Sequence, residues 1–219
     1  MDLNFIVQHI PQYIDAAFLT LKLAAIGIFL SLLLGLLCSL FIYFKIPVVR
    51  QLCSLYIELS RNTPLLVQLF FLYFGLPKIG VFISSEACAI IGLTFLGGSY
   101  MAEAFRSGLN AVETSQIESG LSIGLTRLQL IRYVILAQAF ATSIPPPCAN
   151  FIFLIKETSV FSAVALADLM YVAKDLIGLY YKTDEALLML VIAYLIILLP
   201  ISLLASFVER QVRYAGFGN

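Results

Sequence analysis

The chain has 219 residues, of which 61% are hydrophobic and only 12% are charged, and its formal net charge is zero. A soluble domain usually carries about 25% charged residues, so this chain has too few to cover a water-facing surface. The zero net charge leaves no basic surface for nucleic acid, so we expect no nucleic-acid partner.

The charged residues are clustered and leave five long stretches without charge, 23–44, 62–77, 87–102, 133–155 and 186–208. A helix needs about 20 apolar residues to cross about 30 Å of hydrocarbon. The two shorter stretches reach this length through Glu58 with Arg61 and Glu103 with Arg106, because an i,i+3 pair of opposite charges can partly neutralise itself. We therefore predict an all-α integral membrane protein, a single transmembrane domain over residues 1–219, with five spans at about 16–43, 52–76, 86–107, 129–155 and 186–208.

The positions of the arginines predict the orientation. Arg50 and Arg61 lie between the first two uncharged stretches, another group lies between the third and fourth, and Arg210 and Arg213 follow the last. With five spans these places share one side, which the positive-inside rule assigns to the cytoplasm. The N-terminus is then outside and the C-terminus cytoplasmic. The start of the chain is not basic and its apolar run is too long for a signal peptide, so we retain it as a span.

The second span contains Pro64, which removes a backbone hydrogen bond and predicts a kinked helix. In a bilayer the freed carbonyl must find a partner or a water-lined cavity. Asn62, Thr63 and Gln68 cluster around this position. They are candidates either for hydrogen bonds between helices or for the lining of a substrate pathway.

The third span has small residues at its centre, Gly97-Gly98-Ser99, which predict close packing against another helix. Tyr100 and Glu103 follow at i and i+3 and share one face. An acid at the membrane edge either lines a pathway or pairs at the interface, here with Arg106, and both possibilities stay open.

A polar segment from Glu103 to Arg132 separates the third and fourth spans. Ser115 and Glu118 have capping-box spacing, Ile117 and Leu121 lie at i and i+4, and Gly124 is placed to end a helix. These signals predict a short amphipathic cytoplasmic helix over about 115–124. Its apolar face is too small to anchor securely in lipid, so a groove in a soluble protein is the better partner.

The fourth span begins at a second capping box, Thr126 to Gln129, and contains Pro145-Pro146-Pro147, which cannot continue a regular helix. A broken helix at membrane depth is tolerated where it is buried or lines a cavity. The polar residues that follow are pathway candidates or ordinary helix-end and interface residues: Asn150, Lys156 and Thr158.

The chain then continues with an amphipathic segment, 158–181, which we expect to form a helix on the outer surface. Thr183, followed by Asp184 and Glu185, is a good start for the fifth span.

No catalytic set is visible, so we predict that the chain is not an enzyme. His9 has no carboxylate or cysteine neighbour in sequence, and no G-x-x-x-x-G-K-[ST] stretch occurs, so any ATP must be bound by another subunit. The four cysteines lie in or beside apolar runs without metal-ligand spacing and are predicted to be core residues.

The polar segment and the fourth span resemble the EAA loop of ABC-importer permeases, in particular the polar amino acid branch. The matching residues are Gln116-Ile117-Glu118, Gly124-Leu125-Thr126, Arg132 to Ala139, Pro145-Pro146 and Lys156 to Ser159. Upstream, Glu58 to Leu69, Tyr73 to Pro77 and Tyr100 to Glu103 also resemble that branch, so the match covers nearly the whole chain. The sequence departs from the family pattern at Ser119 and Gly120, which replace two alanines, and at Ala137, which replaces a proline.

The resemblance implies a permease subunit in the bacterial cytoplasmic (inner) membrane. Its partners would be a second permease chain, identical or different, an ATP-binding cassette ATPase dimer that holds ATP and Mg, and an external substrate-binding protein. Glu118 and the short helix would sit in a groove of the ATPase, and Gly124 would allow the exit from that helix. The implied coupling residues are Ser115, Gln116, Ile117, Glu118, Gly120, Leu121, Gly124, Arg127 and Arg132.

The cargo implied by the resemblance is a polar amino acid such as glutamine, glutamate, arginine, histidine or cystine. Two alternatives remain: a permease of the same architecture for another small solute, and a membrane scaffold for a soluble partner. The candidate pathway residues are Asn62, Thr63, Gln68, Tyr100, Glu103, Asn150, Lys156 and Thr158.

Overall fold

The computed structural model describes residues 1–110, 114–135 and 145–217, and every regular element in these ranges is helical. The part of the fourth span and of the family motif that falls on 136–144 lies outside the described residues. The elements are α1 (Leu3–Tyr43), α2 (Val49–Arg61), α3 (Leu65–Phe70), η1 (Phe71–Gly75), η2 (Leu76–Ile79), α4 (Ser85–Asn110), α5 (Thr114–Ser122), α6 (Arg127–Leu130), η3 (Ile131–Ile135), α8 (Pro145–Glu157), η4 (Thr158–Val164), α9 (Leu169–Tyr180) and α10 (Thr183–Phe217).

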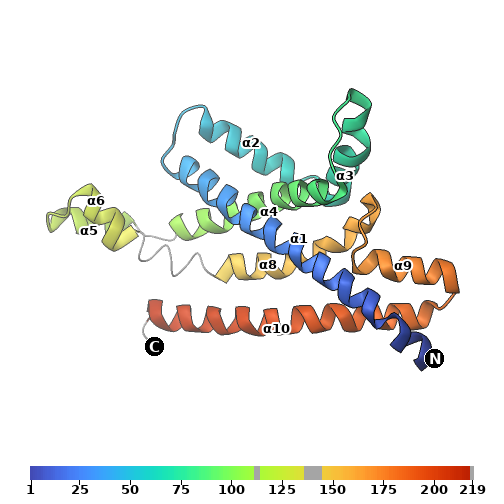
Figure 1. Ribbon diagram of the computed structural model, residues 1–219. Helices are drawn as coiled ribbons and strands as arrows, with labels where there is room; N and C mark the ends of the chain where they lie inside the picture. The colour runs from blue at the N-terminus through green and yellow to red at the C-terminus, as the bar shows by residue number, and fades with distance from the viewer. Residues whose placement is uncertain (111–113, 136–144, 218–219) are drawn as a thin grey trace.

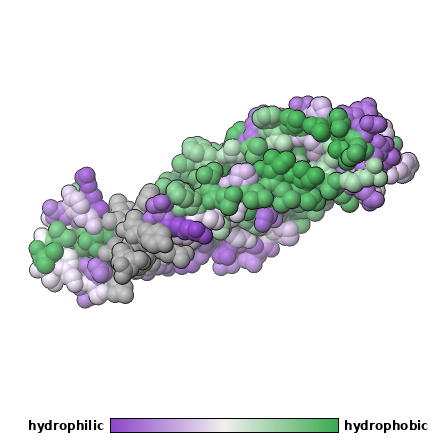
Figure 2. Space-filling model, turned by 90° about the horizontal axis from the view of Figure 1, so that it is seen from below, coloured by the Kyte–Doolittle hydropathy of each residue, from purple (hydrophilic) through white to green (hydrophobic). Residues whose placement is uncertain are grey.

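Three helices in the described ranges are long and apolar enough to cross a membrane: α1, α4 and α10 as far as Val212. Figure 1 shows α1 crossing over α4 and α8, with α10 along the lower side. The turn between α1 and α2, the α5–α6 pair and the C-terminal end of α10 lie at one end, and the N-terminus and α9 lie at the other. On the face seen in Figure 2 apolar residues cover most of the middle, and hydrophilic residues gather towards the two ends.

The contact between α1 and α4 depends on glycine. A Cβ added to Gly97 would lie 2.3 Å from Ser31 Oγ, and one added to Gly98 would lie 2.7 Å from Leu34 Cδ2. From the other side, a Cβ on Gly35 would lie 2.4 Å from Met101 Cβ. The sequence prediction of close packing at Gly97-Gly98 is confirmed, because only hydrogen fits between these helices.

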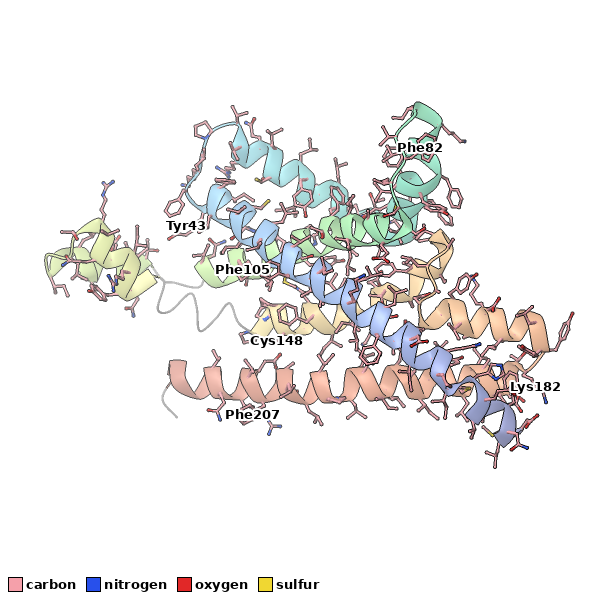
Figure 3. The ribbon with its side chains drawn as sticks, in the orientation of Figure 1. Tyr43, Phe82, Phe105, Cys148, Lys182 and Phe207 are labelled. Atoms are coloured by element: carbon pink, nitrogen blue, oxygen red, sulfur yellow. The ribbon has the colours of Figure 1, made fainter. Side chains whose placement is uncertain are left out.

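An apolar cluster packs α1 against α8, α9 and α10. Its buried residues include Ala16, Ile155, Leu169, Ala173 and Met189. Polar contacts join the starts of α1 and α10 at the end of the molecule where Figure 3 labels Lys182. Lys182 Nζ donates to Asp2 Oδ2 at 3.3 Å, and the backbone N–H of Asp2 donates to Glu185 Oε1 at 2.8 Å. The start of α1 is therefore fixed to the start of α10, and the predicted helix start at Thr183 is confirmed.

The second predicted span is not one kinked helix. Pro64 has extended backbone angles, φ −60° and ψ 142°, and precedes α3, so the chain leaves the helix at Arg61 and begins a new one at Leu65. Proline suits this position because its missing N–H would be unpaired at a helix start. The prediction of one kinked helix over 52–76 is therefore wrong.

Pro145, Pro146 and Pro147 occupy the first turn of α8, where proline is tolerated. The residues before them lie outside the described ranges. One further expectation needs correction. The segment 158–181 forms η4 and then α9, separated by Ala165 in the left-handed conformation at φ 55°. The apolar side of α9 is buried in the core, so this segment is not simply an outer-surface helix.

Candidate functional site

The first candidate site is the hairpin, by which we mean α5, α6 and the turn between them, residues 114–130. Gly124 has φ +86°, a left-handed conformation that glycine adopts without strain. Its N–H donates to Leu121 O at 3.0 Å, and the N–H of Leu125 donates to Gly120 O at 3.1 Å. This pair of bonds is a Schellman motif, which ends α5 where the sequence predicted.

The capping box that begins α6 is also present. The backbone N–H of Gln129 donates to Thr126 Oγ1 at 3.4 Å, and the N–H of Thr126 donates to Gln129 Oε1 at 2.9 Å. The earlier box differs from the prediction, because α5 already includes Thr114 and Ser115 therefore lies within its first turn. The helix itself occupies the predicted segment.

Gly120 explains one departure from the family pattern. It is the buried residue of α5, and a Cβ there would lie 2.4 Å from Leu130 Cδ1. The usual alanine would therefore press against α6. Leu130 belongs to an apolar cluster with Leu109 of α4 and Tyr43 of α1, so the hairpin is packed against the ends of two long helices.

The exposed surface of the hairpin differs from the face that the sequence suggested. Ile117 is partly buried in that cluster, whereas Leu121 is 49% exposed. The largest apolar exposures are at Ile123, 79%, and Leu128, 76%, and the sequence reasoning did not select either. Other predicted coupling residues are exposed on the same hairpin or just after it: Ser115, Gln116, Glu118, Arg127 and Arg132.

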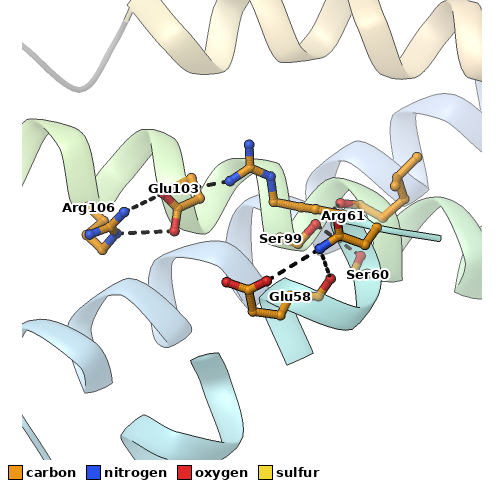
Figure 4. A network of polar contacts seen from close by, with 8 residues as sticks. Glu58, Ser60, Arg61, Ser99, Glu103 and Arg106 are labelled. Atoms are coloured by element: carbon orange, nitrogen blue, oxygen red, sulfur yellow. Dashed lines mark hydrogen bonds and ion pairs between the residues drawn. The ribbon is translucent and has the colours of Figure 1, made fainter. Parts of the chain in front are cut away.

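The second candidate site is the cleft, a cavity of about 410 Å³ between α2 and α4 lined by Ile57, Glu58, Arg61, Asn62, Tyr100, Glu103 and Arg106. Figure 4 shows its ionic centre. Glu103 accepts from Arg106 Nη2 at 2.6 Å and from Arg106 Nε at 3.2 Å, and Arg61 Nη1 lies 3.9 Å from Glu103 Oε2. The predicted Glu103–Arg106 pair is confirmed, while Arg61 pairs with Glu103 rather than with its sequence neighbour Glu58.

Arg61 also lies over the ring of Tyr100, with its Cζ 5.3 Å from the ring centroid. Arg61 ends α2 and its side chain is 43% exposed, but it lies beside Glu103 of α4. It is therefore more than a charge that flanks a span, which is how it enters the prediction of orientation. Below it, Ser60 Oγ donates to Phe95 O at 2.8 Å and lies 3.0 Å from Ser99 Oγ. These buried serines fix α2 against α4 and so fix the position of Arg61.

The predicted pathway residues separate into groups. Asn62, Tyr100 and Glu103 line the cleft. Thr63 and Gln68 instead satisfy the backbone at the helix break: Thr63 Oγ1 donates to Leu59 O at 2.7 Å, and Gln68 Nε2 donates to Ser60 O and Thr63 O at 3.2 and 3.0 Å. The freed carbonyls therefore find local side-chain partners, as the bilayer requires.

The remaining pathway candidates lie away from the cleft. Asn150 Nδ2 contacts Met101 Sδ at 3.9 Å, Lys156 is exposed, and Thr158 is fully buried with its Oγ1 donating to Ile155 O at 2.7 Å. In the described residues no group of three or more His, Cys, Asp and Glu side chains could hold a metal ion.

Asp168 is a polar residue that the sequence reasoning missed. It is fully buried and caps α9, with Oδ1 accepting from the N–H of Tyr171 at 2.9 Å. Its Oδ2 has no hydrogen-bond partner among the described residues. Burial raises the pKa of this carboxyl to about 6, against the opposing effects of the backbone hydrogen bonds and Lys174. No spacing rule identifies such a residue, because its burial depends on helices distant in sequence.

Comparison with known proteins identifies the family. Residues 27–214 match the family described as binding-protein-dependent transport system inner membrane component. The chain is 37% identical to the probable amino-acid ABC transporter permease protein PatM of Vibrio harveyi, over 88% of each chain. It is 36% identical to the probable amino-acid permease protein YxeN of Bacillus subtilis, over 97% of this chain and 96% of that one. It is 31% identical to the glutamine transport system permease protein GlnP of Escherichia coli, over 97% and 98%.

Solved structures of ABC transporters have a similar fold. A crystal structure of an amino acid ABC transporter with histidines matches with a TM-score of 0.90 and 32% identity, covering 96% of this chain and 99% of that chain. An inward-facing MetNI methionine ABC transporter shares the fold, with a TM-score of 0.75 at 20% identity over 91% and 95%. The chain belongs to the binding-protein-dependent transport system inner membrane components and is a permease subunit, not an enzyme.

Proposed function

We propose that this chain forms the translocation pathway for a polar amino acid in an ATP-driven importer of the bacterial cytoplasmic membrane. The observation that carries the substrate class is the cleft, which combines two arginines with two glutamates in one cavity. An amino acid zwitterion presents a carboxylate and an ammonium group, which complement both signs of charge. Relatives named for amino acid or glutamine transport support the same class.

The proposed topology has five spans, with the N-terminus outside and the C-terminus in the cytoplasm. One span is composite, α2 with α3 and the helical turns after it, and the described parts of the fourth span are α6, η3 and α8. The start of α2, which bears Arg50, the hairpin that bears Arg127 and the C-terminal end of α10 lie at the same end of the molecule (Figure 1). This grouping supports the cytoplasmic assignment of that end.

The hairpin is proposed to dock into a groove of an ATP-binding cassette ATPase, which holds the ATP and Mg. Leu121, Ile123 and Leu128 supply the apolar contact, and the exposed Glu118 supplies a charge beside it. Because the cluster around Leu130 joins the hairpin to α1 and α4, movement of the ATPase would be transmitted to the long helices. A second permease chain and an external binding protein complete the proposed transporter.

Uptake by the reconstituted transporter tests the substrate class. The chain, its ATPase and its binding protein are placed in liposomes, and uptake of labelled glutamine, glutamate, arginine, histidine and cystine is measured with and without ATP. We expect ATP-dependent uptake of at least one of them, and a loss of at least tenfold with Glu103→Gln, because Arg61 and Arg106 lose their shared partner. Uptake of none of these amino acids would refute the proposal.

Charge reversal on the hairpin tests the coupling. Glu118→Lys should release the ATPase or abolish the stimulation of ATP hydrolysis by the loaded binding protein, while the chain remains folded in the membrane. The matched control is Asp175→Lys, at an exposed acid in α9. If co-purification and stimulated hydrolysis both survive Glu118→Lys, the hairpin does not use this residue for docking.

A further inference from the structure

The turn between α1 and α2 contains a cavity that the transport function does not use. It has a volume of about 650 Å³ and is lined by Lys45, Pro47, Val48, Arg50, Gln51 and Ser54. We call it the basic groove, because its charged lining residues are one lysine and one arginine and no acid contributes to it.

These two charges are not neutralised within the chain. Lys45 and Arg50 are exposed, and neither forms an ion pair with another described residue. Some other basic residues do have acidic partners: Lys22 contacts Glu86, and Arg106 contacts Glu103. The basic groove thus holds two positive charges without an ion pair to a described residue, beside two polar side chains, Gln51 and Ser54.

The surroundings of the basic groove are apolar. Phe44 is 55% exposed, Val48 66% and Leu52 61%. A soluble anion such as free phosphate would not cover these side chains, whereas acyl chains would. The turn is also built in a strained backbone, with Lys45 at φ 53° and the β-branched Val48 at φ 66°. Such outliers concentrate at functional positions, and here they hold Val48 outward beside the charges.

We infer that the basic groove binds the phosphate headgroup of an anionic phospholipid. Lys45 and Arg50 hold the phosphate, Gln51 and Ser54 can donate hydrogen bonds to the headgroup, and the acyl chains lie over Phe44, Val48 and Leu52. Basic residues at a cytoplasmic membrane surface attract anionic lipid in the leaflet where it meets them.

The basic groove is continuous with the charged network of the cleft. Arg50 and Ser54 also line a smaller cavity of about 230 Å³ that contains Glu58, Glu103 and Arg106. A phosphate that holds Arg50 in the basic groove keeps its charge away from Glu58 and Glu103. The bound lipid would therefore influence the charge balance of the cleft as well as the membrane position of the turn.

Lipid retention tests this inference in the full-length chain, purified as its transporter complex. The complex is exposed to mixed micelles of phosphatidylglycerol and phosphatidylcholine, and the lipid that stays bound is counted by native mass spectrometry. We expect wild type to retain phosphatidylglycerol preferentially, and Lys45→Gln and Arg50→Gln each to lower its affinity about fivefold. The matched control is Lys78→Gln, at an exposed lysine in η2, which should have no effect.

Each alternative has its own outcome. Equal retention of the two lipids by wild type would refute the inference, even if a variant failed to fold. Displacement of phosphatidylglycerol by millimolar inorganic phosphate, with no dependence on acyl chains, would show a site for soluble phosphate instead. A loss of permease dimers in Lys45→Gln or Arg50→Gln without a change in bound lipid would show that the groove is a protein interface. Arg50→Lys should retain most of the lipid, because it keeps the charge.

Discussion

The hairpin and the α1–α4 contact are stabilised in opposite ways. The hairpin is shaped by backbone bonds between near neighbours, the Schellman motif at Gly124 and the capping box at Thr126. The α1–α4 contact is shaped by side chains that meet across large sequence separations, as at Gly35 with Met101 and Gly97 with Ser31. A locally defined unit can keep its shape while it moves, whereas an interdigitated contact resists sliding.

This difference suits a transporter that is driven from one end. In the transporter that we propose, the hairpin would follow the ATPase as a unit, and the α1–α4 pair would respond as a rigid body. The cluster that contains Leu109 and Leu130 is the joint between them. Substitutions that damage one region should therefore leave a different signature from those that damage the other.

The largest expected effect is at Gly97. Gly97→Ala places a Cβ 2.3 Å from Ser31 Oγ and 2.8 Å from Leu154 Cδ1, so α1 and α8 must shift. Overpacking of a buried contact costs about 3 kcal/mol here. Thermal melting in detergent should show the loss, and Gly178→Ala, where nothing lies within 4 Å, should be neutral or slightly stabilising. Equal melting temperatures for the two variants would contradict a close-packed α1–α4 pair.

The next effect is at Gly120, within the hairpin. Gly120→Ala brings a Cβ to 2.4 Å from Leu130 Cδ1, and we expect a local cost of about 2 kcal/mol. Stimulated ATP hydrolysis should fall while the melting temperature of the bundle stays close to wild type. Adding Leu130→Val should restore part of the coupling, because it removes the clashing methyl group. If the single variant melts like Gly97→Ala, the hairpin is not an independent unit.

The two N-caps Asp168 and Thr126 extend the comparison, since the first is buried and the second exposed. The pKa of Asp168 is about 6 in the folded chain against an ordinary 3.8, so the folded chain keeps a proton that the unfolded chain releases. The contribution of this proton to the free energy of unfolding is fully present below about pH 4 and is lost as pH rises through about 6. Asp168→Asn keeps a capping oxygen and should remove this slope, on the order of 2 kcal/mol, in melting curves from pH 4 to pH 8. An unchanged slope would mean that another group titrates there.

The smallest expected effect is at the exposed cap. Thr126→Ala should cost about 1 kcal/mol and act only on the hairpin, because its bonds to Gln129 are local. Hydrogen exchange of the amides in 127–130 should become faster by about fivefold, without a change in α1 or α4. Faster exchange throughout the bundle would show that the hairpin and the long helices open together.

The sequence by itself determined the features that depend on neighbouring residues. Charge-free stretches predicted α1, α4 and α10, capping spacing predicted the start of α6, and Gly124 and Thr183 predicted where helices end and begin. The small side chains at Gly97-Gly98-Ser99 predicted a close helix contact. These signals are reliable because backbone hydrogen bonds and left-handed residues act within a few positions.

Tertiary structure decided the rest. Arg61 pairs with Glu103 of α4 instead of Glu58, Pro64 separates two helices, and Gly120 is buried beneath Leu130. The exposure of Ile123 and Leu128 and the burial of Asp168 were likewise not visible in the sequence. For the burial and the charge pairs, the outcome depends on which distant surface covers the side chain. Burial and charge pairing are properties of the packed bundle, and the order of residues along one helix does not specify them.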